Sequence, residues 1–177
     1  MPDPADRPAP GLRRLDALPA EEAETALRAC CHCTRWARAM AAARPFGTPA
    51  ALFETAERLW ADASDDDVRE AFRGHPRIGE SKAAAGQSDA EKRWSSQEQR
   101  GASSASDEAR RALAEVNRAY EARFGHIYLV CATGKSADEL LAIAQARLGN
   151  DPATELRVAA SEQMKITRLR LEKLLDL

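Results

Sequence analysis

The stretch IYLVCA, residues 127–132, is the only run in the sequence that has the character of an extended segment, since it is short and partly β-branched or aromatic. A single run of this kind has no second strand with which to form a sheet. The remainder of the chain shows helix after helix, separated by capping and stop residues. We therefore predict an all-α fold, a single-domain bundle of about seven to nine helices with residues 127–132 as an extended connector.

Capping residues and glycines predict where most helices begin and end. Thr48 is an N-cap that is followed by proline at the first helical position, and Ser64 and Ser136 are N-caps of later helices. Gly125 is a stop signal for a long helix. The predicted helices cover about residues 20–33, 34–45, 49–62, 65–73, 107–124, 137–148 and 152–175.

Composition limits the classes of function. The net charge is −2 with both signs interspersed, which argues against a nucleic-acid partner and favours small solutes or protein partners. No segment approaches the roughly 20 apolar residues of a membrane span, so we expect no membrane association and a cytoplasmic location. Residues 1–11 are rich in proline and are predicted to be a disordered tail, and residues 12–177 a single helical domain.

Three of the four cysteines lie in the motif CCHC, residues 30–33, and the fourth is Cys131. A closed zinc site needs a second pair of ligands at suitable spacing, and no such pair is present. We interpret the cysteines as small buried side chains on a helix in a reducing compartment and predict no metal. A metal hydrolase that uses His32, His75 and His126 lacks any helical H-x-x-x-H spacing.

The motif HPRIGE, residues 75–80, follows a helix that is expected to end at Gly74 in the left-handed conformation. Pro76 removes a backbone donor and moves His75 out of the helical region, so that the imidazole lies on a stiff, extended corner. An isolated His-Pro pair is also common in surface turns. Because histidine titrates near neutral pH, the corner is a candidate for acid/base chemistry.

The segment SSQEQRGA, residues 95–102, allows two interpretations. Ser95 and Glu98 have the S-x-x-E spacing of a capping box, in which each side chain bonds the backbone amide of the other residue. The adjoining Gln99 and Gly101 add an amide and room for close backbone approach, which a cap does not require. A helix start here would offer free N–H groups to an anionic or carbonyl-rich ligand.

The last predicted helix carries two arginines close together. Arg170 falls on the flank of the apolar face, whereas Arg168 lies further round the helix. An arginine beside an apolar stripe either extends to water or pairs with a buried group. The apolar face consists of Leu156, Ala160, Met164, Leu171 and Leu174.

In this order and spacing, the motifs resemble the 2-oxo-4-hydroxy-4-carboxy-5-ureidoimidazoline (OHCU) decarboxylase family. The resemblance covers residues from about 15 to 175, and HPRIG followed by S-x-x-E-Q-x-G is its most specific part. The sequence departs from the family at CCHC, where a Gly-Ser pair usually follows the first cysteine. The motifs are CCHCTRWARAMAAARPF, LFETAERLW, HPRIGE, SSQEQRGA, FGHIYLVCA, RLGN and ITRLRLEKL.

The resemblance implies an all-helical, cofactor-free homodimer that acts on a small-molecule substrate. The family converts the ureidoimidazoline product of urate oxidation into (S)-allantoin and carbon dioxide. By analogy, His75 and Glu98 are the catalytic residues, and the late arginine of the family falls on Arg170. The implied substrate-binding residues are Pro76, Ser95, Gln99, Tyr128, Leu129, Val130, Cys131, Ala132 and Arg170.

A second hypothesis is a non-catalytic helical binding module, or a partner of another ureide-pathway enzyme, with HPRIGE as a loop epitope. The joint presence of His75, Glu98, Gln99 and Arg170 argues against it, since a scaffold needs none of the four.

Overall fold

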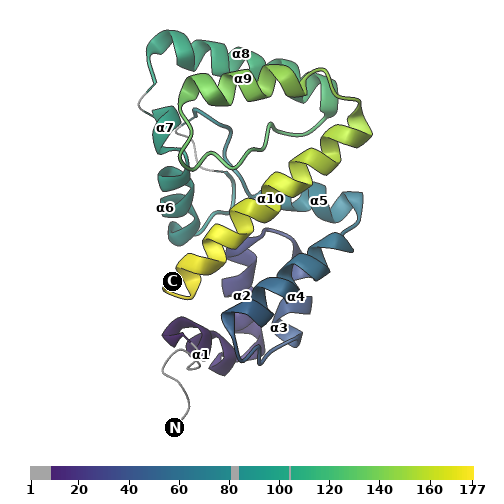
Figure 1. Cartoon of the computed structure of the whole chain (residues 1–177), viewed down its shortest axis with the longest axis vertical. Helices are drawn as coiled ribbons and strands as arrows, with labels where there is room; N and C mark the ends of the chain where they lie inside the picture. The colour runs from purple at the N-terminus through teal and green to yellow at the C-terminus, as the bar shows by residue number, and fades with distance from the viewer. Residues whose placement is uncertain (1–8, 81–83, 104) are drawn as a thin grey trace. The chain divides into compact units, whose positions relative to one another are not determined.

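The computed structural model describes residues 9–80, 84–103 and 105–177, and these residues form ten helices and no strand (Figure 1). The predicted all-α class is confirmed, with one helix more than the upper limit that we expected. None of the described helices has both the length and the apolar character needed to cross a bilayer. The helices are α1 (Pro10–Ala17), α2 (Ala20–Cys30), α3 (Thr34–Ala42), α4 (Pro49–Ala61), α5 (Asp65–Phe72), α6 (Asp89–Glu98), α7 (Arg100–Ser103), α8 (Asp107–Phe124), α9 (Ala137–Arg147) and α10 (Pro152–Leu174).

The chain divides into two compact units. The N-terminal unit comprises the residues up to Glu70 together with Ile166–Leu177, and the central unit comprises Ala71–Lys165. Helices α5 and α10 each contribute residues to both units. A single domain over residues 12–177 remains a prediction.

Local capping chemistry sets most helix boundaries, as the sequence predicts. The Thr48 hydroxyl accepts a hydrogen bond from the Ala51 amide at the start of α4. Ser136 and Glu139 form a capping box at the start of α9. Gly125 ends α8 in the left-handed conformation, with φ of 74°. Because these signals act within one turn, they do not depend on the tertiary fold.

Helix α1 begins inside the tail that the sequence predicts to be disordered. Its first residue is Pro10, and residues 1–8 lie outside the described part of the chain. Leu12 and Leu15 are buried, and a Cβ on Gly11 would lie 2.4 Å from the backbone of Leu175. Packing against the end of α10 therefore stabilises a helix in a segment whose composition suggests disorder.

The core of the central unit surrounds the extended connector. Helices α8 and α9 lie side by side and contribute Leu113, Tyr120 and Leu140, among others (Figure 1). Tyr128 and Val130 of the connector belong to the same buried cluster. The connector predicted at residues 127–132 is thus confirmed as non-helical and unpaired with any strand in the described residues.

Candidate active site

His75 lies on a tight backbone corner immediately after α5. The amides of Gly74 and His75 bond the carbonyl oxygens of Ala71 and Phe72, at 3.2 and 3.1 Å. Gly74 does not have the positive φ that we expected, because these short turns close the helix without a left-handed residue. His75 is only 8% exposed, which excludes the interpretation as a surface turn.

The imidazole of His75 contacts a buried amide from α10. Its Nε2 lies 2.8 Å from Oε1 of Gln163, a residue with no exposed surface. Pro76 is partly exposed beside it. The sequence analysis did not single out Gln163, since one glutamine in an amphipathic helix gives no distinct signal.

Buried side-chain amides hold both ends of the HPRI loop. Gln87 donates from Nε2 to the carbonyl oxygen of Gly74 at 2.9 Å. Asn117 on α8 donates from Nδ2 to the carbonyl oxygen of Ile78 at 2.9 Å. These contacts satisfy backbone groups that would otherwise be buried without partners, so that the loop carrying His75 is fixed at two points.

Ser95 and Glu98 lie on the last turn of α6, so their interpretation as a capping box is wrong. The capping box of α6 is formed instead by Ser88 and Glu91, through bonds of 2.7 and 3.3 Å. Spacing of three residues places Ser95 and Glu98 on one face of the helix, where they are 5% and 8% exposed. The helix start expected near Glu98 is reduced to the single turn of α7.

Polar residues at the end of α6 connect this helix to the loop that carries His75. Ser95 Oγ accepts a hydrogen bond from Nε2 of Gln87, the residue that also bonds Gly74. Gln99 Oε1 accepts a hydrogen bond from the Gly79 amide at 3.0 Å. The structure thus brings the SSQEQ and HPRIG motifs together.

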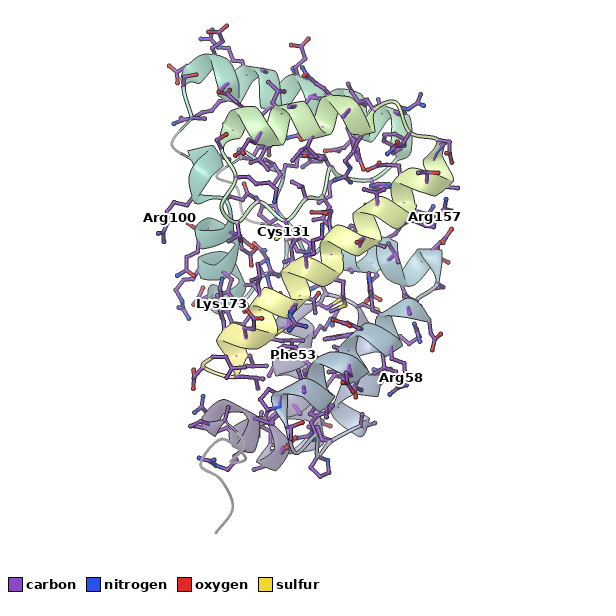
Figure 2. The ribbon with its side chains drawn as sticks, in the orientation of Figure 1. Phe53, Arg58, Arg100, Cys131, Arg157 and Lys173 are labelled. Atoms are coloured by element: carbon purple, nitrogen blue, oxygen red, sulfur yellow. The ribbon has the colours of Figure 1, made fainter. Side chains whose placement is uncertain are left out.

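Side chains bond part of the backbone of the extended connector. The Cys131 amide donates to Glu162 Oε2, and Lys135 Nζ donates to the Cys131 carbonyl oxygen, both at 2.8 Å. Figure 2 labels Cys131 on this segment. As predicted, the backbone approaches closely at Gly101. A side chain there would clash with the backbone after the connector, since a Cβ would lie 2.0 Å from the Lys135 carbonyl oxygen. Burial raises the pKa of the Cys131 thiol, and the nearby carboxylates of Glu162 and Glu98 raise it further.

A buried ionic network anchors the same connector from α9. Arg147 donates from Nη1 to the Leu129 carbonyl oxygen and from Nε to Glu155 Oε1, each at 2.8 Å. Tyr120 and Asn150 also donate to the Glu155 carboxylate. Burial lowers the pKa of Arg147, but the hydrogen bond to Glu155 and the electrostatic effects of Tyr120, Glu155 and Tyr128 together outweigh it, so the pKa is raised. Burial, together with the bond to Glu155, raises the pKa of Tyr120. This network was not predicted from the sequence.

Arg170 lies in the N-terminal unit and Arg168 beside it is exposed. Arg170 is 2% exposed and donates from Nη1 to the Ala29 carbonyl oxygen at 3.4 Å. The Arg168 guanidinium lies 4.3 Å above the Phe53 ring and 3.3 Å from Glu57. The prediction that Arg170 lies nearer the buried side than Arg168 is confirmed. The predicted apolar face is only partly correct, because Ala160, Met164 and Leu174 are partly buried, whereas Ala159, Gln163 and Arg170 are buried. The assignment of Arg170 to the substrate remains a prediction.

The cysteine motif is buried, but only part of it lies on a helix. Cys30 ends α2, whereas Cys31 and Cys33 lie in the connection to α3. All four cysteines of the chain are buried, and none of them forms a disulfide in the described residues. Helix α3 begins immediately after Cys33, which is its N-cap, so the prediction of one helix through all three residues is wrong.

Cys33, Asp67 and Glu70 hold three ligand-type atoms within 4.8 Å of one another. Each atom has a structural role that accounts for its position. Cys33 Sγ accepts a bond from the Trp36 amide, and Glu70 accepts bonds from the backbone and hydroxyl of Thr34. Asp67 accepts a bond from Arg35. The cluster connects the start of α3 to α5 and gives no independent indication of a metal.

Solved structures share this all-helical architecture. The chain superposes on a crystal structure of OHCU decarboxylase in the presence of (S)-allantoin with a TM-score of 0.73 and 32% identity, over 85% of this chain and 96% of that chain. A crystal structure of (S)-allantoin synthase, at 19% identity and a TM-score of 0.67, covers 92% of this chain and 53% of that chain and shows the same fold.

Sequence comparison then assigns the family. The OHCU decarboxylase family model matches residues 16–172, and the chain belongs to this family. The chain is 36% identical to the uric acid degradation bifunctional protein TTL of Arabidopsis thaliana over 155 residues, which are 87% of this chain and 48% of that protein. It is 29% identical to an OHCU decarboxylase of Haloferax volcanii, over 72% of this chain and 73% of that protein. The chain thus spans about half the length of the plant relative.

Proposed function

We propose that this protein is a cofactor-free decarboxylase that converts OHCU to (S)-allantoin and carbon dioxide in urate degradation. The observation that carries the proposal is the buried His75, fixed beside the Ser95–Gln99 turn within a chain of this family. A surface epitope of a binding module would not need a buried imidazole or amides that satisfy the backbone on both sides of it.

The chemistry needs only orientation, charge stabilisation and movement of a proton. Decarboxylation breaks the bond between the ring carbon and the carboxylate carbon, and the electron pair stays on the ring carbon. The adjacent carbon–nitrogen double bond of the imidazoline ring delocalises this pair, which makes an external electron sink unnecessary. A proton then adds to the carbon that bears the ureido group, and the hydroxyl-bearing carbon becomes a carbonyl. His75 acts as the general acid/base at the hydroxyl-bearing carbon, and Pro76 packs beside the substrate. Glu98 accepts hydrogen bonds from the ureido and ring N–H groups.

The remaining predicted residues bind the polar edges of the substrate. The amides of Val130 and Ala132 make no hydrogen bond within the described residues, which supports a role in binding ring oxygens. The Cys131 amide is bonded to Glu162 and is the weaker candidate. Arg170 binds a carboxylate or a carbonyl pair with its planar guanidinium.

Exchange of Glu98 for Gln should remove most of the activity and leave the melting temperature nearly unchanged. The amide keeps the size of the side chain but replaces one acceptor oxygen by a donor, which opposes the substrate N–H groups. Glu91→Gln is the matched control, because it alters the capping carboxylate of the same helix and should affect stability by about 1 kcal/mol or less. Equal activity losses in the two variants would contradict the role of Glu98. Steady-state rates and thermal unfolding measure both effects.

Arg170→Lys should lower activity roughly 10-fold or more, because lysine keeps the charge but cannot make two parallel hydrogen bonds. Arg168→Lys should be nearly silent, since that side chain is exposed and its ion pair with Glu57 is worth little. The two variants are compared under identical generation of the substrate. Loss of activity in Arg168→Lys alone would place the site on the other side of α10.

We further propose that the enzyme is a homodimer, as the family resemblance implies, and that it is located in the cytoplasm. Analytical ultracentrifugation of the purified chain tests the dimer, and a single species of monomer mass at micromolar concentration would contradict it. Fractionation of the source cells tests the location.

The direct test of the proposed activity is release of carbon dioxide from OHCU produced in place by urate oxidase and hydroxyisourate hydrolase. We expect the rate of release to rise in proportion to the concentration of this protein. A rate that stays at that of spontaneous decay would instead support the binding-module hypothesis.

A further inference from the structure

The contact between His75 and Gln163 involves atoms whose hydrogen-bonding roles are complementary. Nε2 of His75 lies 2.8 Å from Oε1 of Gln163, and both side chains are buried. A side-chain amide oxygen can only accept a hydrogen bond, so the ring nitrogen that faces it must carry the proton. In the neutral ring, the lone pair is then on Nδ1.

We propose that Gln163 is a positioning residue that fixes the Nε2–H tautomer of His75, so that Nδ1 exchanges the proton with the substrate. This inference rests on the proposed function, in which His75 is the acid/base. It adds a residue on α10 that acts through the histidine rather than on the reacting atoms.

Glu162, the residue before Gln163 on α10, contacts the extended connector. Glu162 accepts the hydrogen bond of the Cys131 amide and is itself bonded by Lys165. Burial raises the pKa of Glu162, but the bonds from Lys165 and the Cys131 amide outweigh it, so the pKa is lowered. One helical turn therefore orients both the histidine and the extended connector.

The amide at position 163 suits this role better than a carboxylate would. A buried carboxylate beside the imidazole would favour the charged form of the ring at neutral pH, whereas an amide selects the tautomer without adding charge. Burying a glutamine in the interior costs free energy unless its polar atoms are bonded. The contact with His75 offsets part of this cost.

The proposal is tested first by NMR, independently of activity. The ¹⁵N shifts of the His75 ring, assigned by comparison with His75→Ala, report which nitrogen carries the proton. We expect the Nε2–H tautomer in the unaltered protein and, at a pH high enough to keep the ring neutral, in Gln163→Glu, which keeps an acceptor oxygen. In Gln163→Met, which has similar volume and no comparable acceptor, the preference should be lost. A dominant Nδ1–H tautomer in the unaltered protein would overturn the proposal.

Kinetics then separate positioning from substrate binding. Gln163→Met should lower kcat about 10-fold with KM unchanged, which corresponds to the loss of one hydrogen bond. Gln163→Glu should retain more activity than Gln163→Met. An increase in KM at constant kcat would show that Gln163 binds substrate, and full activity of Gln163→Met would show that the contact is dispensable; either result overturns the proposal.

Two controls complete the experiment. Gln97→Glu makes the same chemical change on the exposed side of α6 and should leave kcat and the His75 tautomer unchanged. Circular dichroism confirms that each variant is folded, and if Gln163→Met does not fold, the unaltered protein and Gln163→Glu still decide the tautomer. Absence of decarboxylation by the unaltered protein would refute the proposed function and leave the NMR result on the tautomer intact.

Discussion

Replacing His75 with Ala should lower the turnover number by about 100-fold or more, the effect typical of losing a general acid/base. The side chain is 8% exposed, on a loop whose backbone is fixed by Gln87 and Asn117, so its removal should not displace the loop. His75→Asn should have a similar effect, because the amide has polar atoms but does not exchange protons near neutral pH. Rates are measured with OHCU generated in place.

The far-ultraviolet circular dichroism of His75→Ala must remain that of the unaltered protein for this result to concern chemistry. His126→Ala is a useful comparison, because His126 is a histidine of the same unit that packs against Phe72 and Tyr120 and has no proposed role. Nearly normal activity of folded His75→Ala would mean that the His-Pro corner is structural. The proposed mechanism would then be wrong.

Arg147→Met should destabilise the protein by about 3–5 kcal/mol, because it leaves the Glu155 carboxylate buried without its cation. Arg147 and Glu155 are 7% and 0% exposed, and their nearest atoms are 2.5 Å apart. The variant also removes the donor that holds the Leu129 carbonyl oxygen. Urea unfolding measures the change in free energy of unfolding.

The same substitution at Arg123 provides the matched control. Its guanidinium is exposed, donates to the Asn150 carbonyl oxygen and lies 5.2 Å from the centre of the Phe124 ring, so Arg123→Met should cost about 1 kcal/mol or less. In the double variant Arg147→Met/Glu155→Met much of the lost stability should return, since no unpaired charge remains buried. A cost below about 1 kcal/mol for Arg147→Met alone would contradict the role assigned to the network.

Sequence patterns predict helix boundaries well where the signal is local. The structure confirms the predicted N-caps Thr48 and Ser136, each of which accepts a hydrogen bond from a backbone amide in the first turn of its helix. It also confirms Gly125 as the end of α8. Helix α1 was missed because its stability comes from tertiary contact of Gly11 with Leu175, which composition does not show. Boundaries that depend on packing are therefore the least predictable part of the fold.

The error at α6 has a specific physical cause. Both S88-x-x-E91 and S95-x-x-E98 match the capping-box pattern. Gly86 and the acidic Asp89 beside the first motif favour a helix start there, whereas the tertiary fold buries Ser95 and Glu98 on the inner face of the last turn. The pattern alone thus identifies two candidate starts, and the flanking residues are needed to select between them.

The candidate site was predicted in part. The corner at His75 and the close approach at Gly101 follow from proline and glycine chemistry, and the helical phase correctly places Arg170 on the buried side. Glu162 and Gln163 were missed, because polar residues on an amphipathic helix ordinarily face water. Their roles depend on which residues of the connector and the histidine loop lie opposite them.

We propose that this chain directs decarboxylation of OHCU to one enantiomer of allantoin. The most direct test is circular dichroism of the product, formed from urate with urate oxidase and hydroxyisourate hydrolase, with and without this protein. We predict an optical signal of (S)-allantoin that appears faster than spontaneous decay and is lost with His75→Ala. Racemic allantoin formed at the background rate in the presence of the folded protein would contradict the account.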